Sequence, residues 1–172
     1  MPGKKVLMVI APDKFRDEEY FVPRGIIEKA GHIVTLASST GTEARSSFGK
    51  IVKPDKNFTE INSADYDAIV FVGGSGASTY FTSTQAHNLA REFNEAGKVV
   101  AAICIAPSIL ANAGILAGKR ATAYPSERDN INAVGQFTGA LLETDGNIIT
   151  ANGPDAASAF GDKIVEMLGQ AL

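Results

Sequence analysis

Short runs of consecutive apolar residues constrain the fold of this chain more than any other feature of its sequence. Three such runs are VLMVIA at 6–11, DAIVFV at 67–72 and VVAAI at 99–103. An apolar run without alternation is typical of a strand that is covered on both faces, as in a parallel sheet. Residues 33–37 have the composition of a further strand. These runs therefore predict a parallel sheet that lies between two layers of helices.

Segments with the apolar spacing of helices separate these strands, and glycine follows the first two of them. The expected helices are FVPRGIIEKAG at 21–31, residues 83–96, SILANAGIL at 108–116 and a last helix at about 154–168. Residues 12–18 have the composition of a polar loop. Strands that alternate with helices predict an α/β fold. We expect one domain over residues 1–172, with a flavodoxin-like, doubly wound, mostly parallel sheet sandwiched by helices.

The remaining segments give weaker signals. Residues 120–123 have the composition of a short strand, and 139–143 and 147–151 of two strands joined at a tight Asp-Gly turn. Residues 38–56 are rich in Ser, Thr and Gly, and part of this segment is expected to form a hairpin or an edge excursion.

Composition and charge exclude several classes of function. The net charge is −3, from 16 basic and 19 acidic side chains without a basic run, so no nucleic acid is expected as a partner. No apolar stretch approaches the roughly 20 residues of a membrane helix, and residues 5–11 are followed by charges rather than a cleavage site. A single cysteine cannot form an internal disulfide bond. We therefore expect a cytoplasmic protein without a membrane partner.

Cys104 is the only cysteine of the chain and the strongest candidate for a reactive side chain. It follows the strand at 99–103, at the edge where open α/β sheets build their sites. It also precedes a helix N-terminus, where Pro107 fits the first turn and where a thiolate is favoured over a thiol. A sharp strand–turn–helix is the geometry of a nucleophile elbow, although Ala102 and Ala106 replace its usual glycines. The alternative is a small buried hydrophobic residue.

A second candidate feature is the glycine-rich stretch 73–77, with the sequence GGSGA. Glycine lets backbone N–H groups approach a ligand closely. The stretch lacks the Gly-Lys-Ser/Thr of a P-loop, and Thr79 replaces the third glycine of a dinucleotide-binding motif. If strands 67–72 and 99–103 are neighbours, N–H groups from this loop and from the cysteine turn could form an oxyanion hole. A plain strand-to-helix turn is the alternative.

Five segments, taken in order, resemble the ThiJ/PfpI superfamily. This superfamily includes the Parkinson-associated deglycase-like protein, archaeal intracellular proteases and glyoxalase III enzymes. The segments are KVLMVIAPDKFRDEEYFVP, AGHIVTLAS, DAIVFVGGSGA, GKVVAAICIAPSILANAGILAGKRAT and NIITANGPDAASAF. They cover nearly the whole chain.

The resemblance implies roles for individual residues. Cys104 falls on the elbow cysteine of the family, and Glu19, four residues before Pro23, falls on its acidic partner. In the family this carboxyl group contacts the thiol and is protonated, so it can donate a hydrogen bond or act as an acid/base. The oxyanion-hole N–H groups fall on Gly74 and Ile105, and Gly73 belongs to the same loop. The resemblance also implies a homodimer or higher homo-oligomer and no cofactor.

The histidines depart from the family pattern. Protease-like members follow the cysteine with His, where this chain has Ile105, and other members place His where this chain has Tyr124. We interpret His32 and His87, the only histidines, as structural. A Cys–His pair is the usual way to activate a thiol for amide hydrolysis, so peptidase activity is not favoured. Tyr124 could supply a pocket hydroxyl or be a strand-end aromatic. No metal-ligand cluster is visible.

Three functions from different classes follow from these residues. The first is a cofactor-independent enzyme in which Cys104 adds to a small reactive carbonyl compound, with glyoxalase III or deglycase chemistry. The second is an oxidative-stress sensor or protective chaperone, whose thiolate a peroxide would oxidise without a second cysteine to resolve it. The third is a binding protein with an inert cysteine. We favour the enzyme.

Overall fold

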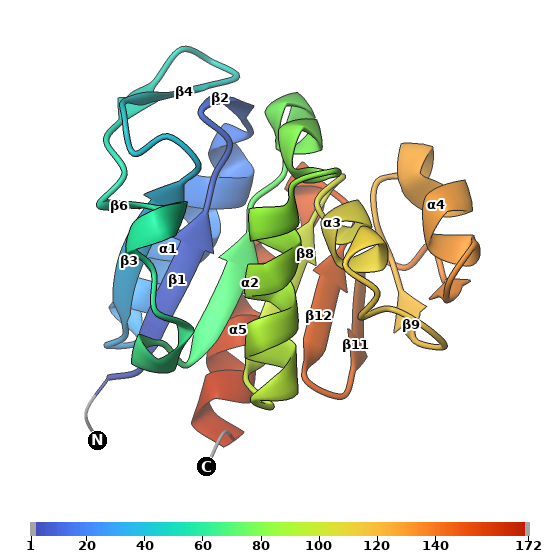
Figure 1. Cartoon of the computed structure of the whole chain (residues 1–172). Coiled ribbons are helices and arrows are strands. Elements are labelled where there is room, and N and C mark those ends of the chain that lie inside the picture. The colour runs from blue at the N-terminus through green and yellow to red at the C-terminus, as the bar shows by residue number, and fades with distance from the viewer. Residues whose placement is uncertain (1–2, 171–172) are drawn as a thin grey trace.

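The computed structural model describes residues 3–170 and shows one seven-stranded sheet between two layers of helices (Figure 1). The strands lie in the order β11-β12-β8-β7-β1-β3-β6. Every neighbouring pair in this sheet is parallel except β11 with β12, which is antiparallel. Helices α1 and α5 cover one face of the sheet, and α2 and α3 cover the other. The predicted doubly wound, mostly parallel sheet is therefore confirmed.

The elements have the following bounds. The strands of the large sheet are β1 (Lys5–Val9), β3 (Ile33–Ser38), β6 (Lys56–Asn57), β7 (Ala68–Phe71), β8 (Val99–Ile103), β11 (Leu142–Asp145) and β12 (Ile148–Ala151). The strands outside it are β2 (Asp13–Phe15), β4 (Ala44–Ser46), β5 (Ile51–Val52), β9 (Arg120–Ala121) and β10 (Gln136–Phe137). The α-helices are α1 (Asp17–Lys29), α2 (Thr84–Glu95), α3 (Pro107–Asn112), α4 (Arg128–Asn132) and α5 (Ala157–Gln170). The 3-10 helices are η1 (Phe58–Glu60), η2 (Ser63–Asp65), η3 (Ser75–Tyr80), η4 (Pro125–Glu127) and η5 (Pro154–Ala156).

Each face of the sheet carries its own hydrophobic core, because successive side chains of a strand point to opposite faces. Met8 of β1 packs in the core with Phe160 of α5. Its neighbour Leu7 packs in the other core with Phe93 of α2. All four side chains are fully buried, and burial of each stabilises the fold by about 2 kcal/mol. The two cores fix the strand register, and the register places the strand ends.

Helix α1 begins earlier than the sequence pattern indicates. It starts at Asp17, and three acidic side chains occupy its first turn, where the positive end of the helix favours them. Residues 13–15 form β2, which pairs with β4. The expectation of a polar loop over 12–18 was therefore wrong for most of this segment. The amphipathic pattern alone did not reveal the helix start, because the first turn is acidic.

Residues 38–56 contain the hairpin that the sequence left open. Strand β4 pairs antiparallel with β5 and parallel with β2. Because β2 directly precedes α1, the hairpin lies at the N-terminal end of this helix. In Figure 1 the hairpin and β2 lie beyond the carboxyl ends of the central strands. This position puts the hairpin beside the edge at which the cysteine turn lies.

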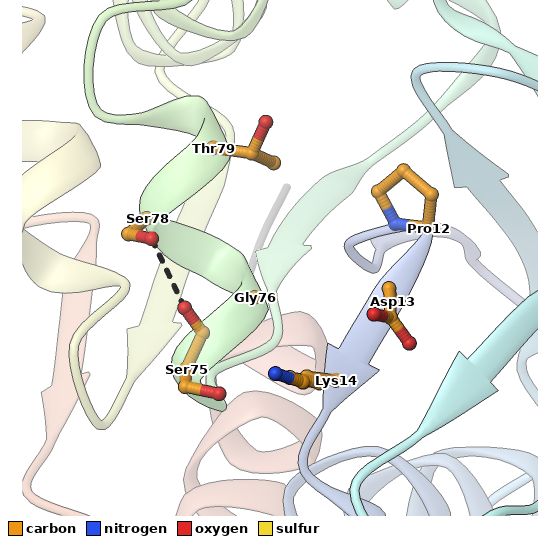
Figure 2. A pocket seen from close by; sticks show the side chains of 7 residues that line it. All are labelled: Pro12, Asp13, Lys14, Ser75, Gly76, Ser78 and Thr79. Carbon is orange, nitrogen blue, oxygen red and sulfur yellow. Dashed lines mark hydrogen bonds between the residues drawn. The ribbon is translucent and has the colours of Figure 1, made fainter.

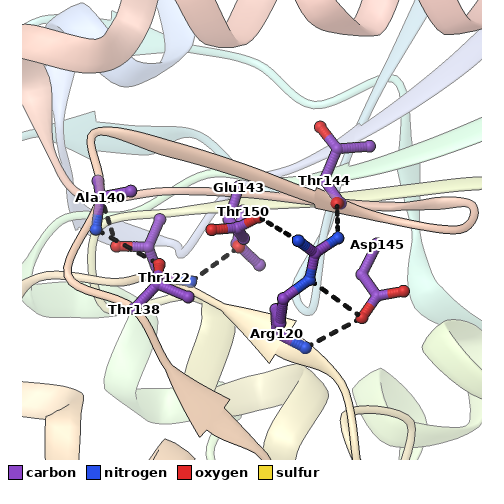
Figure 3. A network of polar contacts seen from close by, with 8 residues as sticks. All are labelled: Arg120, Thr122, Thr138, Ala140, Glu143, Thr144, Asp145 and Thr150. Atoms are coloured by element: carbon purple, nitrogen blue, oxygen red, sulfur yellow. Dashed lines mark hydrogen bonds and ion pairs between the residues drawn. The ribbon is translucent and has the colours of Figure 1, made fainter.

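The strand expected at 120–123 is shorter and lies outside the large sheet, where β9 pairs with β10. A polar network attaches it to the β11–β12 hairpin (Figure 3). The backbone N–H of Arg120 donates to Asp145 at 2.9 Å, and its guanidinium donates to the carbonyl of Thr144 at 3.3 Å. The backbone N–H of Thr122 donates to the Thr150 hydroxyl at 2.9 Å. The network holds the segment that leads to Tyr124, whose backbone N–H donates to the carbonyl of Cys104.

None of the helices in residues 3–170 combines the length and the apolar character that crossing a membrane requires.

Candidate active site

The carboxyl ends of β7 and β8 meet at one edge of the sheet, because these strands are parallel neighbours. The glycine-rich loop follows β7 and the cysteine turn follows β8, as the sequence predicts. Helix α1 begins beside them. Together these segments surround a hollow of about 430 Å³. It is lined by Arg16, Glu18, Glu19, Ser47, Gly74, Ser75, Cys104, Tyr124, Pro154 and Asp155.

Cys104 occupies a strained turn between β8 and α3. Its φ is +65°, in the left-handed region that costs a non-glycine residue about 1–2 kcal/mol. Two hydrogen bonds hold this backbone: its N–H donates to the carbonyl of Ala151 at 3.0 Å, and its carbonyl accepts from the N–H of Tyr124 at 2.8 Å. Only 9% of the residue is exposed. The strain persists because β12 and the backbone of Tyr124 fix the turn, as is common at functional sites.

The carboxyl group of Glu19 lies against the thiol of Cys104 and is fully buried. Among the described residues, neither carboxyl oxygen has a nitrogen or oxygen partner. Burial raises the pKa of Glu19 to about 7, because the charged form loses its hydration, while the hydrogen bond from Cys104 acts in the opposite direction. Near neutral pH the Glu19 carboxyl can therefore both accept and donate a proton.

Gly73 has no side chain, and this leaves room for the side chains of Glu19 and Cys104 to contact each other. A Cβ at this position would lie 2.4 Å from Glu19 Oε1 and 2.5 Å from Cys104 Cβ. Real Cβ atoms do not approach so closely, so any other residue would push the two groups apart. This requirement explains the glycine on packing grounds alone.

Burial raises the pKa of the Cys104 thiol to about 12, and the negative charge of Glu19 acts in the same direction. The backbone N–H groups of Gly74 and Ile105 act in the opposite direction. The N–H groups of the turn therefore favour the thiolate, as the sequence predicts, but burial and the charge of Glu19 outweigh them. Helix α3 is short, and the thiol is buried beside a carboxylate. Burial and the carboxylate together therefore favour the thiol form of Cys104.

The N–H groups of Gly74 and Ile105 lie beside the cysteine side chain and lower the pKa of its thiol, and this is where an oxyanion-hole pair would act. Gly74 has φ of +103°, and a Cβ there would lie 2.4 Å from the backbone nitrogen of Arg16. Only glycine fits this turn between the loop and β2. The backbone of the loop is therefore held rigidly next to the sulfur.

Several residues of the hollow were not found from the sequence. Arg16 pairs with Glu18, with 2.8 Å between Arg16 Nη2 and Glu18 Oε2, and its guanidinium lies 4.9 Å from the centre of the Phe48 ring. Ser47 comes from the β4–β5 hairpin, and Asp155 from η5. No local motif marks them, since three separate segments of the chain bring them to the hollow.

Tyr124 lines the hollow with 48% of its surface exposed. Its hydroxyl has no hydrogen-bond partner among residues 3–170, whereas its backbone is tied to the cysteine turn. Of the two interpretations that the sequence left open, the position in the wall favours the pocket residue.

The two histidines lie away from the hollow. The backbone N–H of Lys4 donates to Nδ1 of His32 at 3.0 Å, and Nε2 of His87 is 2.9 Å from the carbonyl oxygen of Phe81. These backbone contacts agree with the structural roles expected for both. In the part of the chain that the structure describes, no group of three His, Cys, Asp or Glu side chains could hold a metal ion.

Comparison with known proteins gives a consistent result. The model of the DJ-1/PfpI family matches residues 4–167. An uncharacterized protein of Methanocaldococcus jannaschii is 41% identical over 98% of this chain and 84% of its own length. A protein of Pyrococcus abyssi named deglycase is 32% identical over 94% of this chain and 98% of its own length. A Bacillus subtilis protein named as a candidate cysteine protease is 32% identical over 95% and 98%.

Among solved structures, a ThiJ/PfpI domain protein from Brachyspira murdochii is similar with a TM-score of 0.96 and 30% identity. The similarity covers 100% of both chains. The match of the family model and the shared fold agree with the resemblance seen in the sequence. The chain belongs to the DJ-1/PfpI family.

Proposed function

We propose that this chain is a cofactor-independent enzyme that acts on small reactive carbonyl compounds, with glyoxalase III or deglycase chemistry. One observation carries the proposal: the Cys104 thiol and the Glu19 carboxyl form an isolated pair in a hollow beside two backbone N–H groups. The Pyrococcus relative named deglycase supports enzymatic activity in the family. Methylglyoxal is the simplest substrate to consider, since its aldehyde carbon is open to attack by sulfur.

The first step forms a bond between sulfur and carbon. As the Cys104 sulfur attacks the aldehyde carbon, its proton passes to the Glu19 carboxylate, which is the ionised form above a pH of about 7. The aldehyde oxygen becomes an oxyanion, and the N–H groups of Gly74 and Ile105 stabilise it. Glu19 then protonates this oxygen, which gives a hemithioacetal and restores the carboxylate.

The second step moves a proton between two carbons. The Glu19 carboxylate removes the hydrogen of the carbon bound to sulfur, which gives an enediolate, and returns this proton to the neighbouring carbon. The hydroxyl proton on the carbon bound to sulfur passes at the same time to the adjacent oxygen. The product is a thioester of lactate on Cys104. Water hydrolyses this thioester, so the sulfur–carbon bond breaks and the thiol regains its proton. Overall, methylglyoxal and one water give lactate, without any external oxidant or reductant.

Lactate formation from methylglyoxal without glutathione tests this proposal. We expect lactate to accumulate with the unmodified chain and to fall to the background rate with Cys104→Ser, because the attacking sulfur is lost. Full activity of Cys104→Ser would exclude the covalent route. For the deglycase variant of the reaction, the release of an amine from its methylglyoxal adduct is measured in the same way.

The oxidative-stress sensor or chaperone is the second candidate. Oxidation by peroxide requires thiolate character at rest, and both burial and the charge of Glu19 oppose it at Cys104. We therefore rank carbonyl chemistry first. Peptidase chemistry ranks lower still, since neither His32 nor His87 lines the hollow.

We also propose that the protein acts in the cytoplasm as a homodimer or a higher oligomer, as the sequence resemblance implies. Light scattering of the purified protein measures its mass in solution. A mass equal to that of one chain, 18.0 kDa, would exclude the oligomer.

A further inference from the structure

Figure 2 shows a second hollow, of about 480 Å³, which shares one lining residue with the hollow around Cys104 (the cysteine hollow). It lies between β2 and η3 and is lined by Pro12, Asp13, Lys14, Ser75, Gly76, Ser78 and Thr79. Ser75 also lines the cysteine hollow, so the two spaces meet at this residue. A ligand that occupies both would pass Ser75.

The backbone of β2 turns two consecutive charged side chains into this second hollow. Neighbouring residues of a regular strand point to opposite faces. Here both Asp13 and Lys14 line the hollow, while Phe15 is fully buried. Lys14 has φ of +56°, and the pairing of β2 with β4 shifts register between Asp13 and Phe15. Such a bulge re-aims a side chain, and bulges are common beside active sites.

Most polar side chains of this hollow have no partner among the residues that the structure describes. Neither Asp13 nor Lys14 forms an ion pair or a side-chain hydrogen bond with any residue in 3–170. The hydroxyl groups of Ser75 and Thr79 donate no hydrogen bond to any of these residues. Ser78 donates to the carbonyl of Ser75 at 3.0 Å. In Figure 2 the Lys14 ammonium group is directed toward Ser75, with the Asp13 carboxylate on the adjacent wall.

We propose that the second hollow binds the zwitterionic head of a free α-amino acid, whose side chain extends past Ser75 to Cys104. Lys14 pairs with the carboxylate of the ligand, and Asp13 pairs with its ammonium group. A simple anion would meet the charge of Asp13, and a simple cation would meet that of Lys14. A zwitterion satisfies both, and the hydroxyls of Ser75 and Thr79 supply further hydrogen bonds. This inference rests on the proposed function, since the substrate would carry a carbonyl adduct on its side chain.

Alkylation of Cys104 by matched reagents tests the proposal without relying on turnover. The probes are Nε-iodoacetyl-L-lysine, its α-amide, its Nα-acetyl derivative and iodoacetamide. Each forms a bond between the cysteine sulfur and the iodoacetyl carbon and releases iodide. With the unmodified protein we expect the zwitterionic reagent to react about threefold to fivefold faster than either singly charged analogue, which is the usual effect of one exposed ion pair.

Two variants test which side chain of the protein recognises each charged group of the ligand. Lys14→Asn keeps a residue that tolerates the left-handed backbone, and we expect it to remove the rate difference between the acid and the amide. Asp13→Asn is expected to remove the difference between the free and the acetylated amine. Lys29→Gln is the control, because Lys29 is exposed at the opposite end of α1. Circular dichroism checks that each variant is folded.

The outcomes separate the two proposals. If iodoacetamide labels Cys104 but all lysine reagents react at one rate, the amino-acid subsite is wrong and the reactive cysteine stands. The subsite is also wrong if Lys14→Asn leaves the acid-to-amide ratio unchanged. If Cys104 resists every reagent until the protein unfolds, the proposed function fails and with it the inference. The subsite is supported if Lys14→Asn removes the rate difference between the acid and the amide and Asp13→Asn removes the difference between the free and the acetylated amine.

Discussion

The carboxyl group of Glu19 lies fully buried against the thiol of Cys104, and neither of its oxygens has a nitrogen or oxygen partner among the described residues. Burial raises the pKa of Glu19 to about 7 and that of Cys104 to about 12. Between these values the proton stays on sulfur and the charge on carboxylate. The pair is therefore set up for proton transfer during attack rather than for a thiolate at rest, and the following predictions test this arrangement.

Glu19→Gln is expected to lower the pKa of Cys104, because it removes a negative charge that raises it. The shift should be about one unit or more, with about tenfold faster alkylation by iodoacetamide below the pKa. Turnover of methylglyoxal should fall by about 10²-fold or more, since the general base is lost. The pH profile of alkylation, followed by mass spectrometry, gives the pKa of both proteins. A raised pKa in the variant would instead identify Glu19 as a neutral donor to a thiolate.

Stability should depend on pH through Glu19. Its pKa is raised from 4.5 to about 7 on folding, so the folded state holds the proton more tightly than the unfolded state. The stabilisation is complete below pH 4.5 and is lost as the pH rises through about 7. Between pH 5 and 8 this loss amounts to roughly 2–3 kcal/mol.

Urea denaturation of the unmodified protein and of Glu19→Gln at both pH values measures this effect. The neutral amide cannot ionise, so the variant should lose less stability than the unmodified protein over the same range. Equal losses in the two proteins would mean that Glu19 does not titrate in this window.

Gly73→Ala is expected to inactivate the enzyme, because the added Cβ would lie 2.4 Å from Glu19 Oε1 and 2.5 Å from Cys104 Cβ. The forced separation should destabilise the fold by about 1–3 kcal/mol. Gly25→Ala is the matched control, since no atom lies within 4 Å of its added Cβ and the residue is inside α1. This control should stabilise the protein by up to about 1 kcal/mol. Thermal melts and lactate assays of both variants decide the matter, and an active Gly73→Ala would refute the packing argument.

Asp17→Ala is expected to release the hairpin from α1. The buried carboxylate accepts from the Ser46 hydroxyl at 2.6 Å and from the N–H of Phe48 at 3.1 Å. Its loss should cost about 1–3 kcal/mol and raise KM more than it lowers kcat, because Ser47 lines the hollow. Asp162→Ala, at an exposed position of α5, serves as the control. An unchanged KM would show that the hairpin does not shape the substrate site.

Lys14→Gly should stabilise the protein by about 1 kcal/mol, because glycine adopts a φ of +56° without the penalty that lysine pays. Urea denaturation at one pH measures the change. A destabilised variant would show that contacts of the lysine side chain outweigh the backbone strain.

The sequence by itself determined the central part of the fold. Consecutive apolar residues at 67–72 and 99–103 indicate strands that are buried on both faces, and such strands form a parallel sheet in an α/β domain. Parallel neighbours end at the same edge, so the position of Cys104 beside the glycine-rich loop also followed from the sequence. Glu19 could be named only through the resemblance to a family, because no spacing rule relates it to the cysteine.

Only the tertiary structure decided which residues line the site and in which direction the pKa of the thiol is shifted. Ser47 and Asp155 reach the hollow from a hairpin and a 3-10 helix that are far apart in the chain. A helix N-terminus by itself favours a thiolate, but burial and a neighbouring carboxylate oppose it, and these depend on residues brought together by folding. Local pattern fixes where strands and turns lie, whereas desolvation and charge–charge distance arise only when separate segments pack.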